Sequence, residues 1–265
     1  MSRRTTVLAC LVTSSLLTAL VTATPAGAAS AVDYVAMGDS YSSGVGAPGQ
    51  TGLCLRSPLS YAAQWAKKND PASFRTLACG GAKTNDVLLL QVPFLSRKTD
   101  LITISIGGND AGFAPSVISC TLGSDASCAD TVATARTYIT DTLPAALDRT
   151  YRAIKTKAPK ARVFVMGYPR LFDVTNATCG IAGMSIAKRR LLNGGADDLA
   201  GIIRGRAEAA GFTYVDVRDR FDGHGACAAG PWINALTIIP PMDSFHPNTS
   251  GYTSGYLPAL AAALN

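Results

Sequence analysis

Three clustered serines and two histidines are the residues of this 265-residue chain from which the search for nucleophilic chemistry starts; the serines are Ser40, Ser42 and Ser43. Ser40 lies in the stretch Ala-Met-Gly-Asp-Ser-Tyr, at the end of an apolar run, and the histidines are His224 and His246. A serine hydroxyl is a weak nucleophile until a base within hydrogen-bonding reach removes its proton. The two histidines are therefore the candidate bases for an attacking serine.

The residues around the two histidines distinguish them only in part. Asp243 precedes His246 by three positions, where a carboxylate can orient the imidazole and favour its protonated form. The same spacing also suits a turn with a helix cap, because aspartate side chains favour turns. His224 lies in a glycine-flanked loop close to Cys227. His246 is the stronger candidate, and His224 stays open at this point.

The other polar residues near Ser40 have simpler interpretations. Ser42 and Ser43 have no base paired with them in the sequence, so we expect them to line the loop after the nucleophile. Asp39 is expected to organise the turn rather than to carry a proton, because aspartate favours turns.

Short apolar runs alternate with helix-like segments along the rest of the chain. The expected strands are 34–37, 74–78, 101–106, 162–166 and 212–217, and their continuous apolarity predicts burial on both faces. The expected helices are 58–68, 84–92, 131–158, 185–210 and 249–264. This alternation predicts an α/β fold, a three-layer α/β/α sandwich around a mostly parallel sheet of about five strands.

The ends of the expected strands carry residues suited to a site. In open parallel sheets the ligand binds beyond the carboxyl ends of the strands. Four of those ends read Gly38-Asp39-Ser40, Cys79-Gly80-Gly81, Gly107-Gly108-Asn109-Asp110 and Gly167-Tyr168-Pro169. The chain shows no internal repeat and no linker, so we expect residues 29–265 to form a single domain.

The first 28 residues have the composition of a secretory signal. Arg3 and Arg4 precede a mostly apolar run at 7–21, and Ala26-Gly27-Ala28 presents the small residues that a signal peptidase reads. We therefore expect residues 1–28 to be removed and the mature protein to be secreted to the extracellular space.

The charge of the mature chain excludes some functions. Removing the signal leaves 22 basic and 18 acidic residues, a mild excess. No basic block with interleaved aromatics is present, so we expect no nucleic acid as partner. No later segment is long and apolar enough to span a bilayer, so we expect no transmembrane segment.

Six cysteines remain after the signal is removed, and an even number in an exported chain argues for three disulfides. We expect sequential pairing, because short loops cost least to close. The expected pairs are Cys54–Cys79, Cys120–Cys128 and Cys179–Cys227. A metal site built from these cysteines is the alternative, and the lack of a CxxC pair and the scarcity of histidine disfavour it.

Four blocks, taken in order, resemble those of the GDSL or SGNH hydrolases. They are Gly38-Asp39-Ser40, a glycine after the second strand, Gly107-Gly108-Asn109-Asp110, and Asp243-Ser244-Phe245-His246-Pro247. Together they span nearly the whole mature chain. With its export signal and six cysteines, the chain is similar to the secreted bacterial lipases, esterases and phospholipases A1 of that family.

The resemblance implies a role for each matching residue. It makes Ser40 the nucleophile and His246 the base, and it forms an oxyanion hole from the backbone N–H groups of Ser40 and Gly81 and the side-chain amide of Asn109. A glycine lets a substrate approach the backbone closely. An amide supplies N–H donors without a charge, which suits an oxygen that becomes negative only in the transition state. The resemblance implies no cofactor and no metal.

The chain departs from the family pattern in two respects. Tyr41 stands where leucine usually follows Gly-Asp-Ser. Some relatives also orient the histidine with a backbone carbonyl in place of a carboxylate. The orienting group is therefore either the Asp243 carboxylate or a backbone carbonyl, from Ser244 or from Asp243 itself.

Apolar loops are expected around the site, and they favour a lipid ester, either an acylglycerol or a glycerophospholipid. They are Phe113, 168–172 and 238–242. We expect a monomer that contacts a lipid surface transiently, and Lys188-Arg189-Arg190 is expected to be a solvated helix face that could help it approach an anionic one. A carbohydrate acetylesterase is the alternative enzyme, and a non-catalytic secreted binding protein is the alternative outside enzymes.

Overall fold

The computed structural model describes residues 30–179, 181 and 183–265, so the expected secretory signal lies outside the described residues. Within the described ranges, five strands form one sheet in the order β2-β1-β3-β4-β5, and all neighbours are parallel. The strands are β1 (Ser30–Gly38), β2 (Pro71–Thr76), β3 (Leu101–Ser105), β4 (Arg162–Met166) and β5 (Thr213–Val215). Each of the five expected strands is present: β4 has the expected bounds, and the other four differ by at most four residues at an end.

Burial differs between the middle and the edge of this sheet. β3 has a strand on either side and is buried throughout, as its apolar run predicts. β2 pairs only with β1, and three of its six residues are exposed. The expectation of burial on both faces is therefore wrong for β2, because an edge strand has one side without a neighbour.

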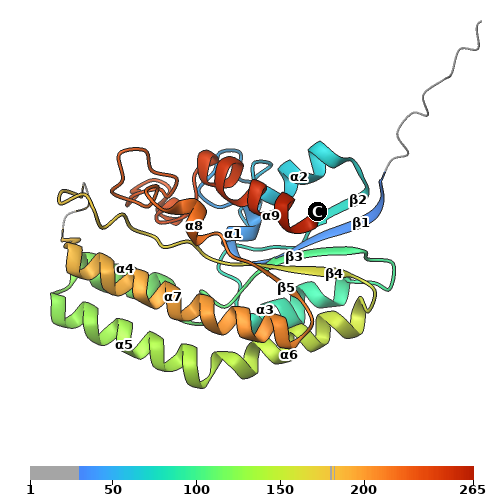
Figure 1. Ribbon diagram of the computed structural model, residues 1–265, viewed down its shortest axis with the longest axis horizontal. Coiled ribbons are helices and arrows are strands. Elements are labelled where there is room, and N and C mark those ends of the chain that lie inside the picture. The colour runs from blue at the N-terminus through green and yellow to red at the C-terminus, as the bar shows by residue number, and fades with distance from the viewer. Residues whose placement is uncertain (1–29, 180, 182) are drawn as a thin grey trace, which may run out of the picture.

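Helices cover both faces of the sheet (Figure 1). One layer contains α1 (Ser40–Ser43), α2 (Tyr61–Asn69), α8 (Arg218–Phe221) and α9 (Leu257–Leu264). The other contains α3 (Thr84–Asp86), α4 (Phe113–Leu122), α5 (Asp125–Asp141), α6 (Leu143–Lys157) and α7 (Ile186–Ala209). The expected three-layer α/β/α sandwich is confirmed.

Four further helical turns complete the described helical elements. They are η1 (Val87–Gln91), η2 (Val92–Phe94), η3 (Pro241–Asp243) and η4 (Gly251–Tyr256). The helix expected over 84–92 is α3 followed by the wide turn η1. The one expected over 249–264 begins as η4 and continues as α9.

The helix expected over 131–158 is two helices. α5 ends at Asp141 and α6 begins at Leu143, with Pro144 in its first turn. Proline lacks a backbone N–H and suits the first turn of a new helix better than the interior of an old one. α4 was not expected at all, because Gly112 precedes it without a side-chain cap and Pro115 interrupts its apolar run.

The cationic run at the start of α7 is buried rather than solvated. Lys188 is 4% exposed, and its ammonium donates to two backbone carbonyls. Arg189 is fully buried, and its guanidinium donates to the carbonyls of Asp173 and Asn176. The expected solvated face is therefore wrong for these two residues, and only Arg190 of the three is exposed. Their stems pack inside while their charged ends bind backbone oxygens.

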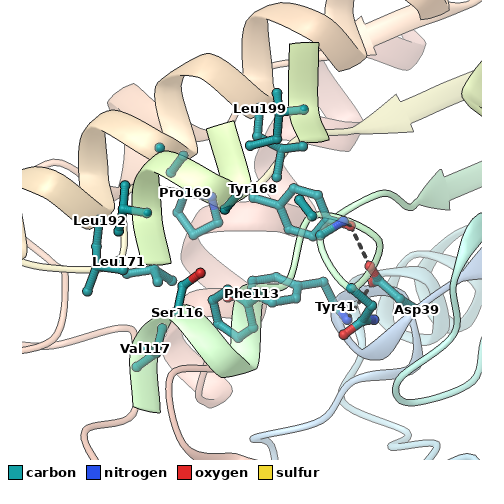
Figure 2. A pocket seen from close by; sticks show the side chains of 18 of the residues that line it. Asp39, Tyr41, Phe113, Ser116, Val117, Tyr168, Pro169, Leu171, Leu192 and Leu199 are labelled. Carbon is teal, nitrogen blue, oxygen red and sulfur yellow. Dashed lines mark hydrogen bonds between the residues drawn. The ribbon is translucent and has the colours of Figure 1, made fainter. Parts of the chain in front are cut away.

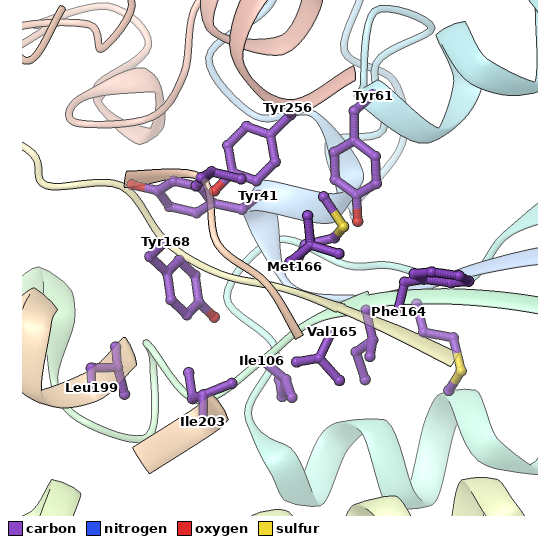
Figure 3. Packing of buried hydrophobic residues seen from close by; sticks show 14 of the residues in the cluster. Tyr41, Tyr61, Ile106, Phe164, Val165, Met166, Tyr168, Leu199, Ile203 and Tyr256 are labelled. Atoms are coloured by element: carbon purple, nitrogen blue, oxygen red, sulfur yellow. The ribbon is translucent and has the colours of Figure 1, made fainter. Parts of the chain in front are cut away.

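Three disulfides and a group of stacked aromatic rings link segments of the fold. The bonds join Cys54 to Cys79, Cys120 to Cys128 and Cys179 to Cys227, which is the sequential pairing expected. Tyr61 and Tyr256 stack with ring centroids 5.4 Å apart, and Tyr41 lies beside them in the core (Figure 3). None of the helices in the described part of the chain combines the length and apolarity needed to cross a bilayer.

Candidate active site

Ser40 lies immediately beyond β1, as the first residue of α1. Gly38 makes this sharp exit possible, because its φ is +109° and a Cβ there would lie 2.1 Å from the Ser105 carbonyl oxygen. The Asp39 carboxylate caps the helix by accepting a 3.0 Å hydrogen bond from the backbone N–H of Tyr41. Ser40 is thereby held at the carboxyl edge of the sheet.

His246 faces Ser40 across this edge. Its Nε2 is 2.8 Å from Ser40 Oγ, and its Nδ1 is 2.9 Å from the carbonyl oxygen of Ser244. A carbonyl oxygen can only accept, so Nδ1 carries the proton and donates it to Ser244. Nε2 is then the unprotonated nitrogen, ready to accept the proton of the serine hydroxyl.

Asp243 does not take the orienting position. Its Oδ1 accepts a 2.6 Å hydrogen bond from Gln50 Nε2, and among the described residues no hydrogen bond joins its carboxylate to His246. Of the groups expected to orient the imidazole, the structure brings the Ser244 carbonyl to Nδ1. The carboxylate of Asp243 acts on His246 through its charge.

The surroundings of His246 keep it neutral. Burial lowers its pKa to about 4, and this effect outweighs the Ser244 hydrogen bond and the Asp243 charge, which both raise the pKa. At neutral pH the imidazole therefore carries no positive charge. This is the form that a general base requires.

The expected oxyanion donors lie on the neighbouring strand ends. Gly81 has φ +80°, and no atom lies within 4 Å of the position that a Cβ would take, so open space faces its backbone. The amide of Asn109 donates through Nδ2 to the carbonyl of Ala82 at 3.0 Å, which fixes the amide and leaves its other N–H for a ligand. Among the described residues, neither Ser40 N nor Gly81 N donates a hydrogen bond.

A buried network that the sequence did not predict connects the nucleophile turn to the Asn109 turn. The Asp39 carboxylate accepts a hydrogen bond from the hydroxyl of Tyr168 (Figure 2). It accepts a second one from the hydroxyl of Ser105. Tyr168 Oη in turn accepts from the backbone N–H of Gly108 at 3.2 Å. Burial raises the pKa of Asp39 to about 6. Asp39 organises the turn as expected, but its partners come from two other strands.

Two further contacts in this region were also missed. Gln91 holds Gly38 on both sides, with its oxygen accepting from Gly38 N at 2.7 Å and its Nε2 donating to Gly38 O at 2.8 Å. The Asp110 carboxylate accepts from Thr84 N and from Thr84 Oγ1, at 3.0 and 2.6 Å. Asp110 therefore ties the Asn109 turn to the segment after Gly81. In the sequence, the only signal for Gln91 is a polar residue inside an apolar helical stretch.

The remaining serines and the second histidine lie in structural positions. Ser42 Oγ is bonded to the hydroxyls of Tyr61 and Ser105, at 2.7 and 2.8 Å, and Ser43 Oγ donates to a backbone carbonyl. His224 Nδ1 is bonded to the Gly230 carbonyl, and its ring stacks on Trp232 with centroids 3.8 Å apart. None of these side chains contacts His246 through a hydrogen bond in the described ranges.

An apolar pocket opens beside Ser40, between α4, α5 and α7 (Figure 2). Its empty space amounts to about 710 Å³ when the part open to solvent is included. Its apolar lining comprises Phe113, Val117, Val132, Ile139, Leu171, Leu192 and Leu199. Tyr168 and Pro169 also line it, as expected, whereas 238–242 does not. Most of the lining comes from helices rather than from the expected loops.

Known proteins resemble this chain along most of its length. The model of the GDSL-like lipase/acylhydrolase family matches residues 36–253. Lipase 1 of Streptomyces coelicolor (strain ATCC BAA-471 / A3(2) / M145) is 45% identical over 250 residues, which cover 93% of this chain and 92% of that protein.

Two solved structures resemble the fold closely. Phospholipase A1 from Streptomyces albidoflavus NA297 has a TM-score of 0.85 and 44% identity, covering 88% of this chain and 99% of that one. The extracellular lipase from Streptomyces rimosus has a TM-score of 0.84 and 44% identity, covering 88% of this chain and all of that one.

Proposed function

The chain belongs to the GDSL-like lipase/acylhydrolase family, and we propose that it is a secreted serine hydrolase that cleaves acyl esters of lipids through an acyl-enzyme on Ser40. The observation that carries this proposal is the position of His246, whose Nε2 lies 2.8 Å from Ser40 Oγ while Nδ1 is held by the Ser244 carbonyl. Nucleophilic catalysis by serine requires a base that is hydrogen-bonded to the serine hydroxyl on one side and to an orienting group on the other.

The reaction proceeds in two halves. Ser40 Oγ attacks the ester carbonyl carbon while His246 Nε2 takes the hydroxyl proton. The tetrahedral adduct then expels the alcohol, which receives that proton from His246, and an acyl-serine remains. In the second half His246 takes a proton from water, the resulting hydroxide attacks the acyl-serine, and the fatty acid leaves as the proton returns to Ser40 Oγ. General acid-base help of this kind accelerates reactions by about 10² to 10⁴.

The negative oxygen of the two tetrahedral adducts needs hydrogen-bond donors. The backbone N–H groups of Ser40 and Gly81 and the free N–H of Asn109 supply them in this proposal. The donors are held in place before the substrate binds, because Ala82 fixes the Asn109 amide and Asp110 fixes the segment after Gly81. Preorganised donors lower the barrier because they need no rearrangement as charge develops.

The pocket beside Ser40 supports a lipid substrate. It holds an acyl chain of the ester, because aliphatic and aromatic side chains form most of its lining and Asp39 is the single ionisable group among the described lining residues apart from the tyrosines. An acetyl group would contact only a small part of that apolar lining. The relatives named lipase and phospholipase A1 support an acylglycerol or a glycerophospholipid as the class of substrate.

The location and form of the protein belong to the same proposal. Residues 1–28 act as a secretory signal, and residues 29–265 form one domain that works outside the cell as a monomer. The three disulfides are consistent with an oxidising environment. A relative described as an extracellular lipase supports this location.

A fluorophosphonate probe tests whether Ser40 is the nucleophile. The native protein should become covalently labelled and inactive, and Ser40→Ala should not be labelled. Ser43→Ala is the matched control, because Ser43 Oγ is bonded to a backbone carbonyl and has no base beside it. Labelling of Ser40→Ala at the native rate would exclude Ser40 as the nucleophile. A complete lack of labelling in the folded native protein would favour a non-catalytic binding protein.

The substrate class is tested by measuring acid release from phosphatidylcholine, triacylglycerol and acetylated xylan in parallel. We expect fatty acid from the first two and little acetate from the third. Release of acetate alone would show a carbohydrate acetylesterase and would contradict the assignment of the pocket to a long acyl chain.

A further inference from the structure

Two loops beside the site expose large apolar side chains to solvent. Leu53, Ile238 and Ile239 are 101%, 84% and 86% exposed, and Leu236 and Met242 are about half exposed. Single exposed apolar residues are ordinary, but a group of them on neighbouring loops marks a surface that contacts something apolar. We call these five residues the apolar rim.

Hydrogen bonds bring the two loops of the apolar rim together at the site. Gln50, three residues before Leu53, donates a 2.6 Å hydrogen bond to Asp243, the residue after Met242. The carbonyl of Cys54 accepts from the backbone N–H of Gly80, next to the oxyanion donor Gly81. The second loop leads directly into His246. The apolar rim therefore lies beside the oxyanion segment and beside the base.

The segments that carry the apolar rim contain no charged residue. Charged residues make up 16% of the chain, yet residues 40–55 and 223–242 contain no aspartate, glutamate, lysine or arginine. Burying an unpaired charge is costly, so a surface that enters an apolar medium should lack charges. A surface that meets an anionic or cationic partner would need the opposite charge, and these segments supply none. Among the possible occupants, this composition favours the interior of an uncharged lipid layer.

We propose that the apolar rim inserts into the surface of aggregated lipid and docks the site on its substrate. This rests on the proposed function, because a lipid ester reaches the pocket from a vesicle or a droplet. Leu53 and the pair Ile238 and Ile239 enter the layer on either side of Ser40 and His246. The ester then moves into the pocket without crossing bulk water. Burial of apolar side chains at the interface supplies the binding free energy.

The test compares the rate of hydrolysis of a dissolved ester with the rate of ester hydrolysis on vesicles. Ile238→Ser/Ile239→Ser and Leu53→Ser should hydrolyse dissolved p-nitrophenyl butyrate within about twofold of the native rate, because none of the three residues lines the pocket. On phosphatidylcholine vesicles the double variant should lose about tenfold or more, the effect of removing buried apolar surface from two side chains. All the changed residues are exposed, so the fold should persist, and thermal unfolding checks this.

Leu89→Ser/Leu90→Ser is the matched control. These leucines are 65% and 66% exposed on η1, which follows α3 in the layer on the opposite face of the sheet (Figure 1). The control should keep its rate on vesicles. The proposal would be overturned if the Ile238/Ile239 and Leu89/Leu90 double variants lost the same fraction of the rate on vesicles. It would also be overturned if both kept the native rate on vesicles.

Binding to vesicles without turnover separates this inference from the proposed function. Ser40→Ala should sediment with phosphatidylcholine vesicles, and adding Ile238→Ser/Ile239→Ser should release it into the supernatant. If the native protein binds vesicles through the rim but releases no fatty acid, the proposed substrate fails and the docking surface stands. If the native protein hydrolyses vesicles while the rim variants bind them normally, the docking surface fails and the proposed function stands.

Discussion

The hydroxyl of Tyr41 donates a 2.8 Å hydrogen bond to the carbonyl oxygen of Phe245, and this bond joins the nucleophile helix to the loop that carries His246. Phe245 is buried and has φ +59°, a left-handed conformation that costs free energy for any residue other than glycine. Its backbone N–H donates to the carbonyl of Asn234 at 3.1 Å. Both peptide groups of Phe245 are therefore held, and this directs the Ser244 carbonyl at His246.

Tyr41→Phe should lower kcat about three- to tenfold with little change in KM, because one hydrogen bond that orients the base is lost while the ring and the pocket remain. Tyr151→Phe is the matched control: Tyr151 is fully buried, its hydroxyl has no hydrogen-bond partner in the described residues, and it lies outside the site. Removing the Tyr151 hydroxyl should leave kcat unchanged. Similar kcat losses in the two variants would mean that the effect of Tyr41 is only on stability.

Asp243→Asn should cost less than about tenfold in kcat, whereas His246→Ala should lose about 10² to 10⁴. Asparagine keeps an oxygen that can accept the Gln50 hydrogen bond, so the substitution removes the charge and little else. The Ser244 carbonyl still holds Nδ1 in the variant. Steady-state kinetics on a dissolved ester measures both values. Near-complete loss in a folded Asp243→Asn protein would instead assign the orienting role to the carboxylate.

Asn109→Ala should lower kcat about 10² to 10³, the typical effect of removing one oxyanion donor. The exposed amide of Asn69 makes a similar bond to a backbone carbonyl, at 2.8 Å, on α2. Asn69→Ala therefore controls for the loss of an amide bond and should keep its kcat. A kcat loss below threefold or so in Asn109→Ala would remove this residue from the oxyanion hole.

The pH dependence follows from the lowered pKa of His246. The imidazole is neutral above about pH 4 and becomes protonated as the pH falls through that value, which removes the base. The acid limb of kcat/KM should therefore have its midpoint near pH 4 rather than near the ordinary histidine value of 6.5. The unfolded chain takes up this proton near pH 6.5, so the contribution of His246 to the free energy of unfolding decreases as the pH falls from about 6.5 to about 4. Burial raises the pKa of Asp39 to about 6, so Asp39 contributes in the opposite direction as the pH falls through that value. Circular dichroism at each pH separates unfolding from loss of the base, and a midpoint near 6.5 in folded protein would contradict the prediction.

Replacing each disulfide by a pair of serines should lower stability in the order of the loops that the bonds close. The sequence separations are 48 for Cys179–Cys227, 25 for Cys54–Cys79 and 8 for Cys120–Cys128. The chain-entropy relation gives losses of about 4, 3.5 and 2.5 kcal/mol in the free energy of unfolding.

Of the three replacements, only that of Cys54–Cys79 should also lower kcat in the folded protein. The backbone carbonyl of Cys54 accepts a hydrogen bond from the backbone N–H of Gly80, which lies beside Gly81. Denaturant unfolding and kinetics on a dissolved ester measure the two effects. An equal kcat loss in the Cys120–Cys128 variant would argue against this local role.

The sequence by itself predicted the elements of the sheet and the residues that we propose for the site. The apolar runs predicted the five strands because strands buried between helices leave an uninterrupted local pattern. Ser40, Gly81, Asn109 and His246 stood out because each lies in a short block that resembles a block of a known family and follows a strand or precedes a helix. Such signals lie within a few neighbouring residues, so they can be read without the fold.

Only the tertiary structure decided how these residues are held. The choice of the Ser244 carbonyl at His246 depends on the left-handed Phe245, and that conformation depends on Tyr41, about two hundred positions earlier in the chain. The bond from Tyr168 to Asp39 likewise joins the ends of two strands that are distant in sequence. Lys188 and Arg189 looked like a solvated face because their burial depends on backbone carbonyls brought to them by other segments. Long-range hydrogen bonds leave no periodic trace in the sequence, and they set the geometry on which the chemistry depends.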